Sequence, residues 1–314
     1  MQMPVNSDHT QAHPFLKWAG GKRQLLAQLE AHFPPQLLSG EISRYAEPFV
    51  GSGALFFRVF QTHPIRECLL TDVNPELILV YKTIQKDVDR LIACLGEIET
   101  RYLDLDHNQR QDFYYQIRTK YNQQRDTVQY QDYDQCWAKR SAYMLFLNRT
   151  GYNGLFRLNS KGEFNVPFGR YKNPRLLDVD NLHNAAALLQ GVSIQYGDFE
   201  EIADFVDDTT LVYFDPPYRP LSTTAHFTSY SKEIFDDSQQ LRLAEFYRIL
   251  DAKGGKLMLS NSDPHNVDPL DDFFERAYQG FRIERLKAKR NINRDAAKRG
   301  LISELLVLNY GTGQ

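Results

Sequence analysis

Two short motifs contain residue types that could bind a nucleoside and activate an amine. Asp215-Pro216-Pro217-Tyr218 directly follows the apolar run 211–214, and Gly51-Ser52-Gly53 follows the run 44–50. Consecutive prolines cannot continue a strand, so they stiffen the backbone where the run ends. This would project the Asp215 carboxylate, the Pro216 carbonyl and the Tyr218 ring from the edge of a sheet. A purely structural turn is the alternative, but the presence of both motifs favours a ligand site.

The glycine motif is typical of a backbone that approaches a ligand closely after a buried strand. Asp72 ends the next apolar run, 68–71, and lies about 20 residues beyond the glycines, which suits a carboxylate that accepts hydrogen bonds from a ribose. The third glycine of the dinucleotide-binding pattern is absent, which argues against a cradle for a pyrophosphate. The pattern therefore indicates an adenosine-containing cofactor of unspecified type, with an ordinary strand–helix turn as the alternative.

The groups of the Asp-Pro-Pro-Tyr motif suit chemistry on the exocyclic amine of adenine. This amine is a poor nucleophile because its lone pair is delocalised into the ring. A carboxylate and a carbonyl that accept its two N–H bonds would favour the pyramidal amine, which can attack a sulfonium methyl group. An aromatic ring can stack on the base. Such catalysis rests on positioning and electrostatics, so we expect no metal.

The elements that must position these motifs alternate along the chain. Apolar runs bounded by Gly, Pro, Asp or Asn predict strands, and amphipathic stretches between them predict helices. This alternation predicts an α/β fold with a mostly parallel sheet. The predicted strands are 44–50, 68–71, 192–196, 211–214 and 256–260, with 304–310 as a last strand at the edge of the sheet; the predicted helices are 54–60, 75–84 and 238–250.

The stretch 86–175 interrupts the alternation. It is helix-rich, polar and aromatic, and it ends in a loop dense in Gly, Asn and Arg. We interpret it as an inserted domain with its own task. The predicted organisation is a disordered leader over 1–13, a catalytic domain over 14–85 and 176–314, and a target-recognition domain over 86–175.

Bulk composition excludes several protein classes. The 314 residues are 42% hydrophobic and 25% charged, as in globular proteins. Three cysteines without C-x-x-C spacing argue against a disulfide framework or a zinc site and fit a cytoplasmic location. We expect no secretory signal and no membrane span. The 18 Tyr and 20 Phe residues could build large cores or flat faces that stack on bases.

The net charge of −3 does not by itself suggest a nucleic-acid-binding protein, but basic residues cluster locally. Such clusters can bind the phosphate backbone, although solvated surface loops are an equally good interpretation. One cluster is Arg285, Lys287, Lys289, Arg290, Arg294, Lys298 and Arg299; the other is Arg157, Lys161, Arg170, Lys172 and Arg175.

From 15 to 310 the chain resembles the Dam-type DNA adenine-N6 methyltransferases, in the branch that recognises GATC. The resemblance rests on Phe15-Leu16-Lys17-Trp18-Ala19-Gly20-Gly21-Lys22, on the glycine motif, and on Asp-Pro-Pro-Tyr after an insertion, in that order. It implies a Rossmann-like methyltransferase sheet with helices on both faces, plus a mainly helical DNA-recognition domain with a β-hairpin. It also implies methyl transfer from S-adenosylmethionine, giving S-adenosylhomocysteine, to a flipped adenine in double-stranded DNA.

The resemblance assigns roles to individual residues. The catalytic residues would be Asp215, Pro216, Pro217 and Tyr218. The cofactor would contact Trp18, Ala19, Gly20, Lys22, Phe49, Gly51, Ser52, Gly53, Asp72, Asp198 and Phe199, with Asp72 at the ribose and Asp198 at the adenine amine. DNA would contact Lys17, Tyr152, Asn153, Leu155, Arg157, Arg170 and Lys172.

Within the recognition segment, each of these residues would have its own task. Tyr152 would wedge into the stack left by the flipped base, and Asn153 would hold the orphaned partner base or an adjacent base pair. Leu155 would touch a thymine methyl, and Arg157 would contact a guanine edge. Arg170 and Lys172 would grip phosphates.

Several alternatives remain. Gly20-Gly21-Lys22 lacks the first glycine of a P-loop and is followed by Arg23, which argues against an ATPase. A methyltransferase for a different amine is one alternative, with cytosine N4, adenine in RNA or a protein glutamine amide as the substrate. A catalytically inactive DNA-binding module is another. We expect a monomer associated with the nucleoid and a mobile loop over 219–232. The sequence leaves open whether the methylation serves restriction–modification, repair marking, regulation or evasion of host defence.

Overall fold

The computed structural model describes residues 11–18, 20, 22–219, 235–289 and 301–311. The chain forms two compact units, which we describe separately: Met1–Gly20 with Asn74–Val192, and Gly21–Val73 with Ser193–Gln314. The first unit is larger than the predicted recognition domain of 86–175. The physical reason is that helix α4 starts at Pro75 and continues across position 86 to Leu103.

The expected leader and loop lie largely outside the described residues. Residues 1–10 of the leader are not described, but Ala12 is buried and the backbone N–H of His13 donates to Asn181 Oδ1 at 2.9 Å. Ala12 and His13 are thus in contact with the first unit. Of the predicted mobile loop, only Arg219 is described; of the C-terminal basic cluster, Arg290, Arg294, Lys298 and Arg299 are outside the described residues.

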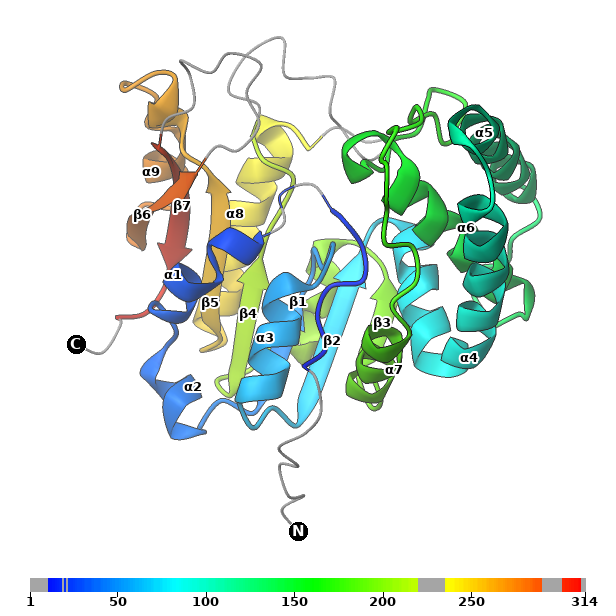
Figure 1. Ribbon diagram of the computed structural model, residues 1–314. Helices are drawn as coiled ribbons and strands as arrows, with labels where there is room; N and C mark the ends of the chain where they lie inside the picture. Colours follow the sequence, from blue (N-terminus) through cyan, green and yellow to red (C-terminus); the bar gives the residue numbers. More distant parts are fainter. Residues whose placement is uncertain (1–10, 19, 21, 220–234, 290–300, 312–314) are drawn as a thin grey trace. The chain divides into compact units, whose positions relative to one another are not determined.

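The second unit contains a seven-stranded sheet in the order β3-β2-β1-β4-β5-β7-β6 (Figure 1). β1 to β5 are mutually parallel, whereas β7 runs antiparallel to both β5 and β6. The sheet is thus the α/β, Rossmann-like methyltransferase type expected from the sequence. The strands are β1 Arg44–Glu47, β2 Glu67–Asp72, β3 Ser193–Tyr196, β4 Thr210–Phe214, β5 Lys256–Ser262, β6 Arg282–Lys289 and β7 Leu301–Leu308.

The prediction of an edge position for the last strand was wrong. β7 lies between β5 and β6, and the edge strand is β6. β6 was missed because its second half, from Arg285, belongs to the basic run, for which we weighed phosphate binding against a solvated surface loop and predicted no strand. β7, which is apolar and buried from Leu305 to Leu308, needs neighbours on both sides to satisfy its backbone.

Helices cover both faces of the sheet, with α1 and α3 on one face and α8 on the other (Figure 1). α8 and α9 pack their apolar sides with β4, β5 and β7 into one core, which includes Phe214, Tyr247 and Leu257. This packing fixes the ends of the parallel strands. The helices are α1 Leu26–Glu30, α2 Pro35–Ser39, α3 Ala54–Thr62, α8 Asp237–Ala252 and α9 Phe273–Ala277, with short 3-10 turns η1 Lys22–Gln24, η3 Phe199–Phe205 and η5 Pro264–Asn266.

The first unit is helical: α4 Pro75–Leu103, α5 His107–Gln124, α6 Cys136–Thr150, η2 Tyr152–Gly154 and α7 Val179–Leu188. Asn74 caps α4, and Asp106 with Gln109 forms a capping box at the start of α5. The aromatic residues of this stretch mostly build its core, which answers the question left open by composition. Buried aromatics are Tyr102, Phe113, Tyr114, Tyr121, Trp137, Tyr143 and Phe146.

One face of α5 supports the loop that follows α6. The Tyr114 hydroxyl donates to the Val166 carbonyl at 2.9 Å, and Asn122 forms two hydrogen bonds with the backbone of Phe164 at 2.8 and 3.1 Å. The loop doubles back through isolated antiparallel bridges, Gly151 with Phe168 and Leu158 with Phe164, in place of regular strands. The expected β-hairpin is therefore a short, externally braced turn.

A buried ion pair links α4 to α6. The Arg140 guanidinium, 1% exposed, donates to both oxygens of Glu76, and Tyr130 donates to the same carboxylate. We expect Arg140→Met to lower the free energy of unfolding by about 3–5 kcal/mol, because it leaves a buried carboxylate uncompensated. Denaturant unfolding of the full chain measures this. Arg276→Ala, which removes a mostly exposed pair with Asp272, should cost less than about 1 kcal/mol. Equal losses of unfolding free energy in the two variants would contradict the stabilising role of the buried Arg140–Glu76 pair.

Candidate active site

Four neighbouring parallel strands of the second unit each end at or near a carboxylate. Glu47 is the last residue of β1, Asp72 the last of β2, Asp198 follows β3, and Asp215 follows β4. Open α/β sheets bind ligands at the carboxyl ends of their strands. The sheet order therefore brings four acidic groups to the edge where a ligand is expected.

The glycine motif follows β1 as predicted and requires glycine at two positions. Gly51 and Gly53 have φ angles of 48° and 67°, in the left-handed region that other residues rarely adopt. The Gly51 N–H donates to Asp72 Oδ2 at 3.2 Å, and Gly53 precedes the first turn of α3. Ser52 is half-buried beside them. The backbone turn and the carboxylate predicted to meet a ribose are thus in direct contact.

Asp198 and Phe199 are held by a residue that the sequence analysis missed. The guanidinium of Arg242, on α8, donates to both oxygens of Asp198 and lies 4.4 Å from the centre of the Phe199 ring. Phe199 is buried and packs against Phe49, with ring centres 5.6 Å apart. Phe199 is therefore part of the apolar core of this unit. The Arg242 contacts join residues 44 positions apart in sequence, so no local pattern predicts them.

The Asp-Pro-Pro-Tyr segment leaves the buried strand β4 and is clamped from one side. The Pro217 carbonyl accepts from Gln240 Nε2 at 3.0 Å, and the backbone of Arg219 bonds to Asn261 and Ser262 at 3.3 and 3.1 Å. Among the described residues, none donates to the Pro216 carbonyl. The segment is thus fixed through its later residues, Pro217 and Arg219.

Lys22 is the centre of an ionic cluster with the catalytic candidates. Its ammonium group, only 3% exposed, lies 2.9 Å from Asp215 Oδ1 and 3.1 Å from Glu304 Oε2. Tyr218 completes the cluster: its hydroxyl donates to Glu304 and accepts from Lys22. Lys22 was predicted to contact the cofactor; in this structure its partners are Asp215, Glu304 and Tyr218. Glu304 was not predicted as a site residue.

Burial raises the pKa values of two carboxyl groups at this edge. The pKa of Asp215 is raised to about 6 by burial, opposed by Lys22 and reinforced by Glu304. The pKa of Glu47 is raised to about 8, mainly by burial, although the Tyr45 hydroxyl donates to it at 2.7 Å and lowers the value. The charges of Asp215 and Asp72 add to the pKa increase at Glu47. These carboxylates therefore repel one another and would gain from a nearby cation.

The donor set fits S-adenosylmethionine. Its sulfonium and ammonium groups are cations that would relieve the repulsion around Glu47, and its ribose hydroxyls can donate to Asp72. The glycine turn leaves room for the backbone to approach such a ligand. No group of His, Cys, Asp and Glu suited to a metal ion occurs within the described part of the chain.

In the first unit, the N-terminal segment is tied to the predicted recognition loop. The side chain of the buried Asn148 accepts from the backbone N–H of Lys17 and donates to the Lys17 carbonyl. It also donates to the Gly154 carbonyl at 2.8 Å. Gly154 has φ of 63°, and a Cβ there would lie 2.6 Å from Lys17 Cδ. Trp18, predicted at the cofactor, stacks on Phe156 with ring centres 5.7 Å apart. Ala19 lies outside the described residues, and Gly20 is exposed.

The predicted DNA-contacting residues lie on or beside this loop. Tyr152 is 53% exposed, and Asn153 is also exposed and adopts a left-handed φ of 55°. Arg157 donates to Asn165 Oδ1 at 2.7 Å, which fixes its guanidinium. Leu155 is half-buried, whereas Arg170 and Lys172 are exposed. The loop therefore carries one oriented cation, Arg157, among freer side chains.

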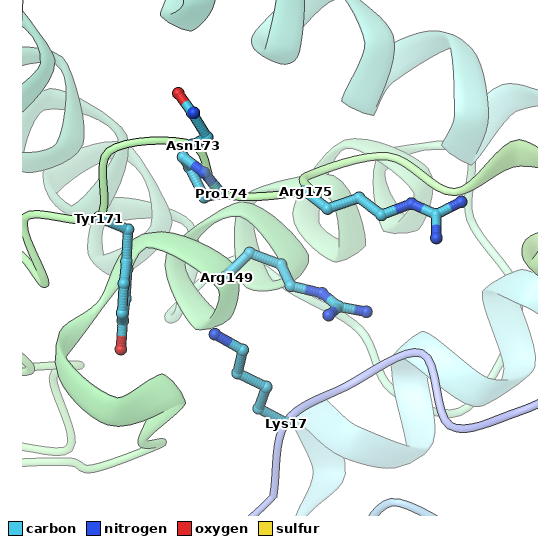
Figure 2. A pocket seen from close by; sticks show the side chains of 6 residues that line it. All are labelled: Lys17, Arg149, Tyr171, Asn173, Pro174 and Arg175. Atoms are coloured by element: carbon cyan, nitrogen blue, oxygen red, sulfur yellow. The ribbon is translucent and has the colours of Figure 1, made fainter.

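A cationic pocket of about 230 Å³ lies next to the loop. Figure 2 shows that Lys17, Arg149 and Arg175 contribute to it from three separate segments. Lys17 lies 4.7 Å from the centre of the Tyr171 ring, and burial together with Arg149 lowers its pKa. Arg149 also donates to the Phe15 carbonyl. Sequence reasoning identified Lys17 but not Arg149, whose position inside α6 gave no signal.

The comparisons with known proteins agree with the site. Residues 18–292 match the family model described as D12 class N6 adenine-specific DNA methyltransferase. The chain belongs to this family. The type II methyltransferase M.MjaIII of Methanocaldococcus jannaschii is 49% identical over 298 residues, covering 95% of this chain and 99% of that protein. M1.LlaDCHI of Lactococcus lactis subsp. cremoris is 36% identical, covering 95% of each chain. The DNA adenine methylase of Escherichia coli K12 is 34% identical, covering 94% of each.

Membership makes this chain an adenine-specific DNA methyltransferase that uses S-adenosylmethionine, so adenine N6 is its target and DNA its substrate. The amine chemistry predicted for the Asp-Pro-Pro-Tyr motif agrees with this activity. Among the helices that the structure describes, none has the length and apolar character needed to cross a bilayer.

Glu47 makes stability depend on pH. In the folded state its pKa is about 8, against an ordinary value of 4.5, so between these values the native state binds more protons than the unfolded state. Stability contributed by protonated Glu47 is therefore lost as the pH rises towards 8. We expect Glu47→Gln to have a higher melting temperature than wild type at pH 8.5 and a similar one at pH 4.5. Glu67→Gln, at an exposed site on β2, should show no such difference. If the melting temperatures of wild type and Glu47→Gln changed in the same way with pH, this account would be contradicted.

Proposed function

We propose that this methyltransferase acts on an adenine flipped out of double-stranded DNA, within the site GATC, through Asp215, Pro216 and Tyr218. The observation that carries the proposal is the Asp-Pro-Pro-Tyr segment itself. It is clamped at Pro217 and Arg219, yet its Asp215 carboxylate faces an ammonium and its Pro216 carbonyl has no donor among the described residues. One charged and one neutral acceptor suit the two N–H bonds of one amine.

The reaction joins N6 of adenine to a methyl carbon. S-adenosylmethionine supplies this methyl on a positively charged sulfur, and the S–C bond breaks as the N–C bond forms. Asp215 and the Pro216 carbonyl would hold the two amine hydrogens and direct the lone pair at the methyl group. The Tyr218 ring would stack on the base. Asp215 must be ionised to accept a hydrogen, and it could then pass the released proton to water.

Cofactor residues can be proposed from the same edge. Asp72 would accept hydrogen bonds from the ribose, and the turn Gly51-Ser52-Gly53 would pass close to the cofactor. Asp198 would meet the adenine amine of the cofactor, with Arg242 fixing the carboxylate. Phe49, half-buried, and Phe199 beneath it would form an apolar wall. Trp18, Ala19 and Gly20 precede Lys22 in the segment assigned to the cofactor by resemblance.

The first unit supplies the proposed DNA contacts. The oriented guanidinium of Arg157 suits the edge of a guanine, and the exposed Tyr152 ring suits insertion into the gap left by the flipped base. Asn153 and Leu155 would contact neighbouring bases. The cations of the pocket and the exposed Arg170 and Lys172 suit phosphates. Relatives named DNA adenine methylase support adenine in DNA as the target, and the choice of GATC rests on the resemblance of the sequence. A monomer acting on chromosomal DNA would associate with the nucleoid.

Labelled S-adenosylmethionine and unmethylated duplexes test the proposal directly. One duplex carries GATC and the controls carry single changes in that site. Label on N6 of adenine in GATC alone is the expected result, and Asp215→Ala should abolish it while DNA binding persists. Label at another adenine site would overturn the GATC proposal without affecting the enzyme class. Turnover by purified Asp215→Ala would overturn the catalytic assignment.

Two variants separate base reading from phosphate binding. Arg157→Ala should relax the preference for one base pair by about 1–3 kcal/mol, because a two-pronged contact to guanine is lost. Lys172→Ala should instead weaken binding to all duplexes alike and reduce the salt dependence by about one phosphate contact. Competition binding across single-change duplexes at two salt concentrations measures both. An unchanged site preference for Arg157→Ala would argue against the base contact.

A further inference from the structure

Glu304 is the member of the ionic cluster for which no role has been assigned. It lies near the start of β7, where the register pairs it with Ser262 at the end of β5. Because β7 is antiparallel, its first residues lie at the edge where the parallel strands end. This reversal brings the Glu304 carboxylate to the Asp-Pro-Pro-Tyr segment, 86 residues away in sequence. A strand added in parallel would have placed its first residues at the opposite edge.

Within the described residues, the Glu304 side chain contacts Tyr218, a catalytic candidate, and Lys22, which faces a second one. Its Oε2 atom accepts from the Tyr218 hydroxyl and lies 3.1 Å from the Lys22 ammonium, which also faces Asp215. The side chains are largely withdrawn from solvent, with exposed fractions of 18% for Glu304, 20% for Asp215 and 3% for Lys22. The Oε2 atom of Glu304 thus links the Tyr218 hydroxyl to the Lys22 ammonium. Among the described residues, Lys22 is the only cation that faces Asp215.

The charges of the cluster explain why a second carboxylate is useful. An ammonium has three donors, so Lys22 can serve two carboxylates and a hydroxyl at once. Paired with Lys22 alone, Asp215 would form a closed, neutral pair. With Glu304 present, the two carboxylates and one ammonium keep a net charge of −1. This charge suits a cationic methyl donor. Because Lys22 is shared with Glu304, its interaction with Asp215 is also weaker than in an exclusive pair.

We propose that Glu304 is a positioning residue of the methyl-transfer site, which fixes the Tyr218 ring through its hydroxyl and shares Lys22 so that Asp215 can accept an amine hydrogen. This inference rests on the proposed roles of Asp215 and Tyr218. It adds to them a group that touches neither substrate nor cofactor and acts through Lys22 and Tyr218.

The Glu304→Gln variant keeps an acceptor for the Tyr218 hydroxyl but removes the charge. We expect kcat for methylation of a GATC duplex to fall by about tenfold to 100-fold, with DNA affinity unchanged. The charge of Glu304 raises the pKa of Asp215, whereas Lys22 lowers it. Removing Glu304 therefore lowers this pKa, and the acid limb of the kcat–pH profile should move to lower pH. Glu47 and Tyr213, the other titratable groups coupled to Asp215, are retained in the variant.

Further variants separate a positioning role from a structural one. Glu304→Ala removes both contacts and should lower kcat further, and adding Tyr218→Phe to it should cost little more because the hydrogen bond is already lost. Glu284→Gln, on β6, removes a carboxylate paired with Arg282 and should leave kcat and the pH profile unchanged. Melting temperatures are recorded for each variant. If Glu304→Gln is unstable, Tyr218→Phe tests the other end of the same hydrogen bond.

The outcomes distinguish this inference from the function on which it rests. A wild-type kcat and an unmoved acid limb in Glu304→Gln would overturn the role of Glu304, even where Asp215→Ala is inactive. Turnover by Asp215→Ala would instead overturn the catalytic assignment itself. A lower kcat together with a shifted acid limb and unchanged DNA affinity would support the positioning role, because loss of fold alone does not shift the limb.

Discussion

The ammonium of Lys22 compensates an accumulation of negative charge that the sheet topology imposes. Four parallel strands end in or near carboxylates, and the antiparallel β7 adds a fifth, Glu304, at the same edge. Burying unpaired carboxylates is costly, so the edge must be neutralised by a cation or by protons. Lys22 neutralises the end nearest β4, where it faces Asp215 and Glu304. At the β1 end, burial and neighbouring charges raise the pKa of Glu47 to about 8.

This distribution of charge is less stable than a neutral edge would be, and that is consistent with a binding site. A group whose charged form is disfavoured in the free protein gains most when a complementary cation arrives. Glu47 and Asp72 would be relieved by a ligand that is positively charged and rich in donors. Asp215, whose pKa burial raises to about 6, would gain from the N–H donors of an amine. The same repulsion that lowers stability therefore favours the binding of a cationic methyl donor and its acceptor.

Local sequence patterns predicted the elements and the motifs, because both depend on neighbours in the chain. The strands β1 to β5 and helices α3 and α8 lie where apolar runs and periodicity indicated, and the glycine turn and Asp215 follow their strands. The same patterns missed β6, since its strand character depends on pairing with β7. They also missed Glu304 and Arg242, whose partners are 86 and 44 residues away. Such contacts follow from strand order, and a single sequence does not state strand order.

The recognition loop illustrates the same division between local and distant determinants. Its glycines and exposed aromatic and basic residues are visible in the sequence, but what fixes its shape is not. Tyr114 and Asn122 on α5 bind its backbone carbonyls and amides, and Asn148 ties it to the segment around Lys17. These bonds satisfy part of the loop's backbone from outside, and Asn159 within the loop accepts from the amides of Lys161 and Glu163. A backbone held from outside, with the Arg157 guanidinium oriented by Asn165, suits the proposed reading of base edges, since mobile contacts lose affinity to ordering entropy.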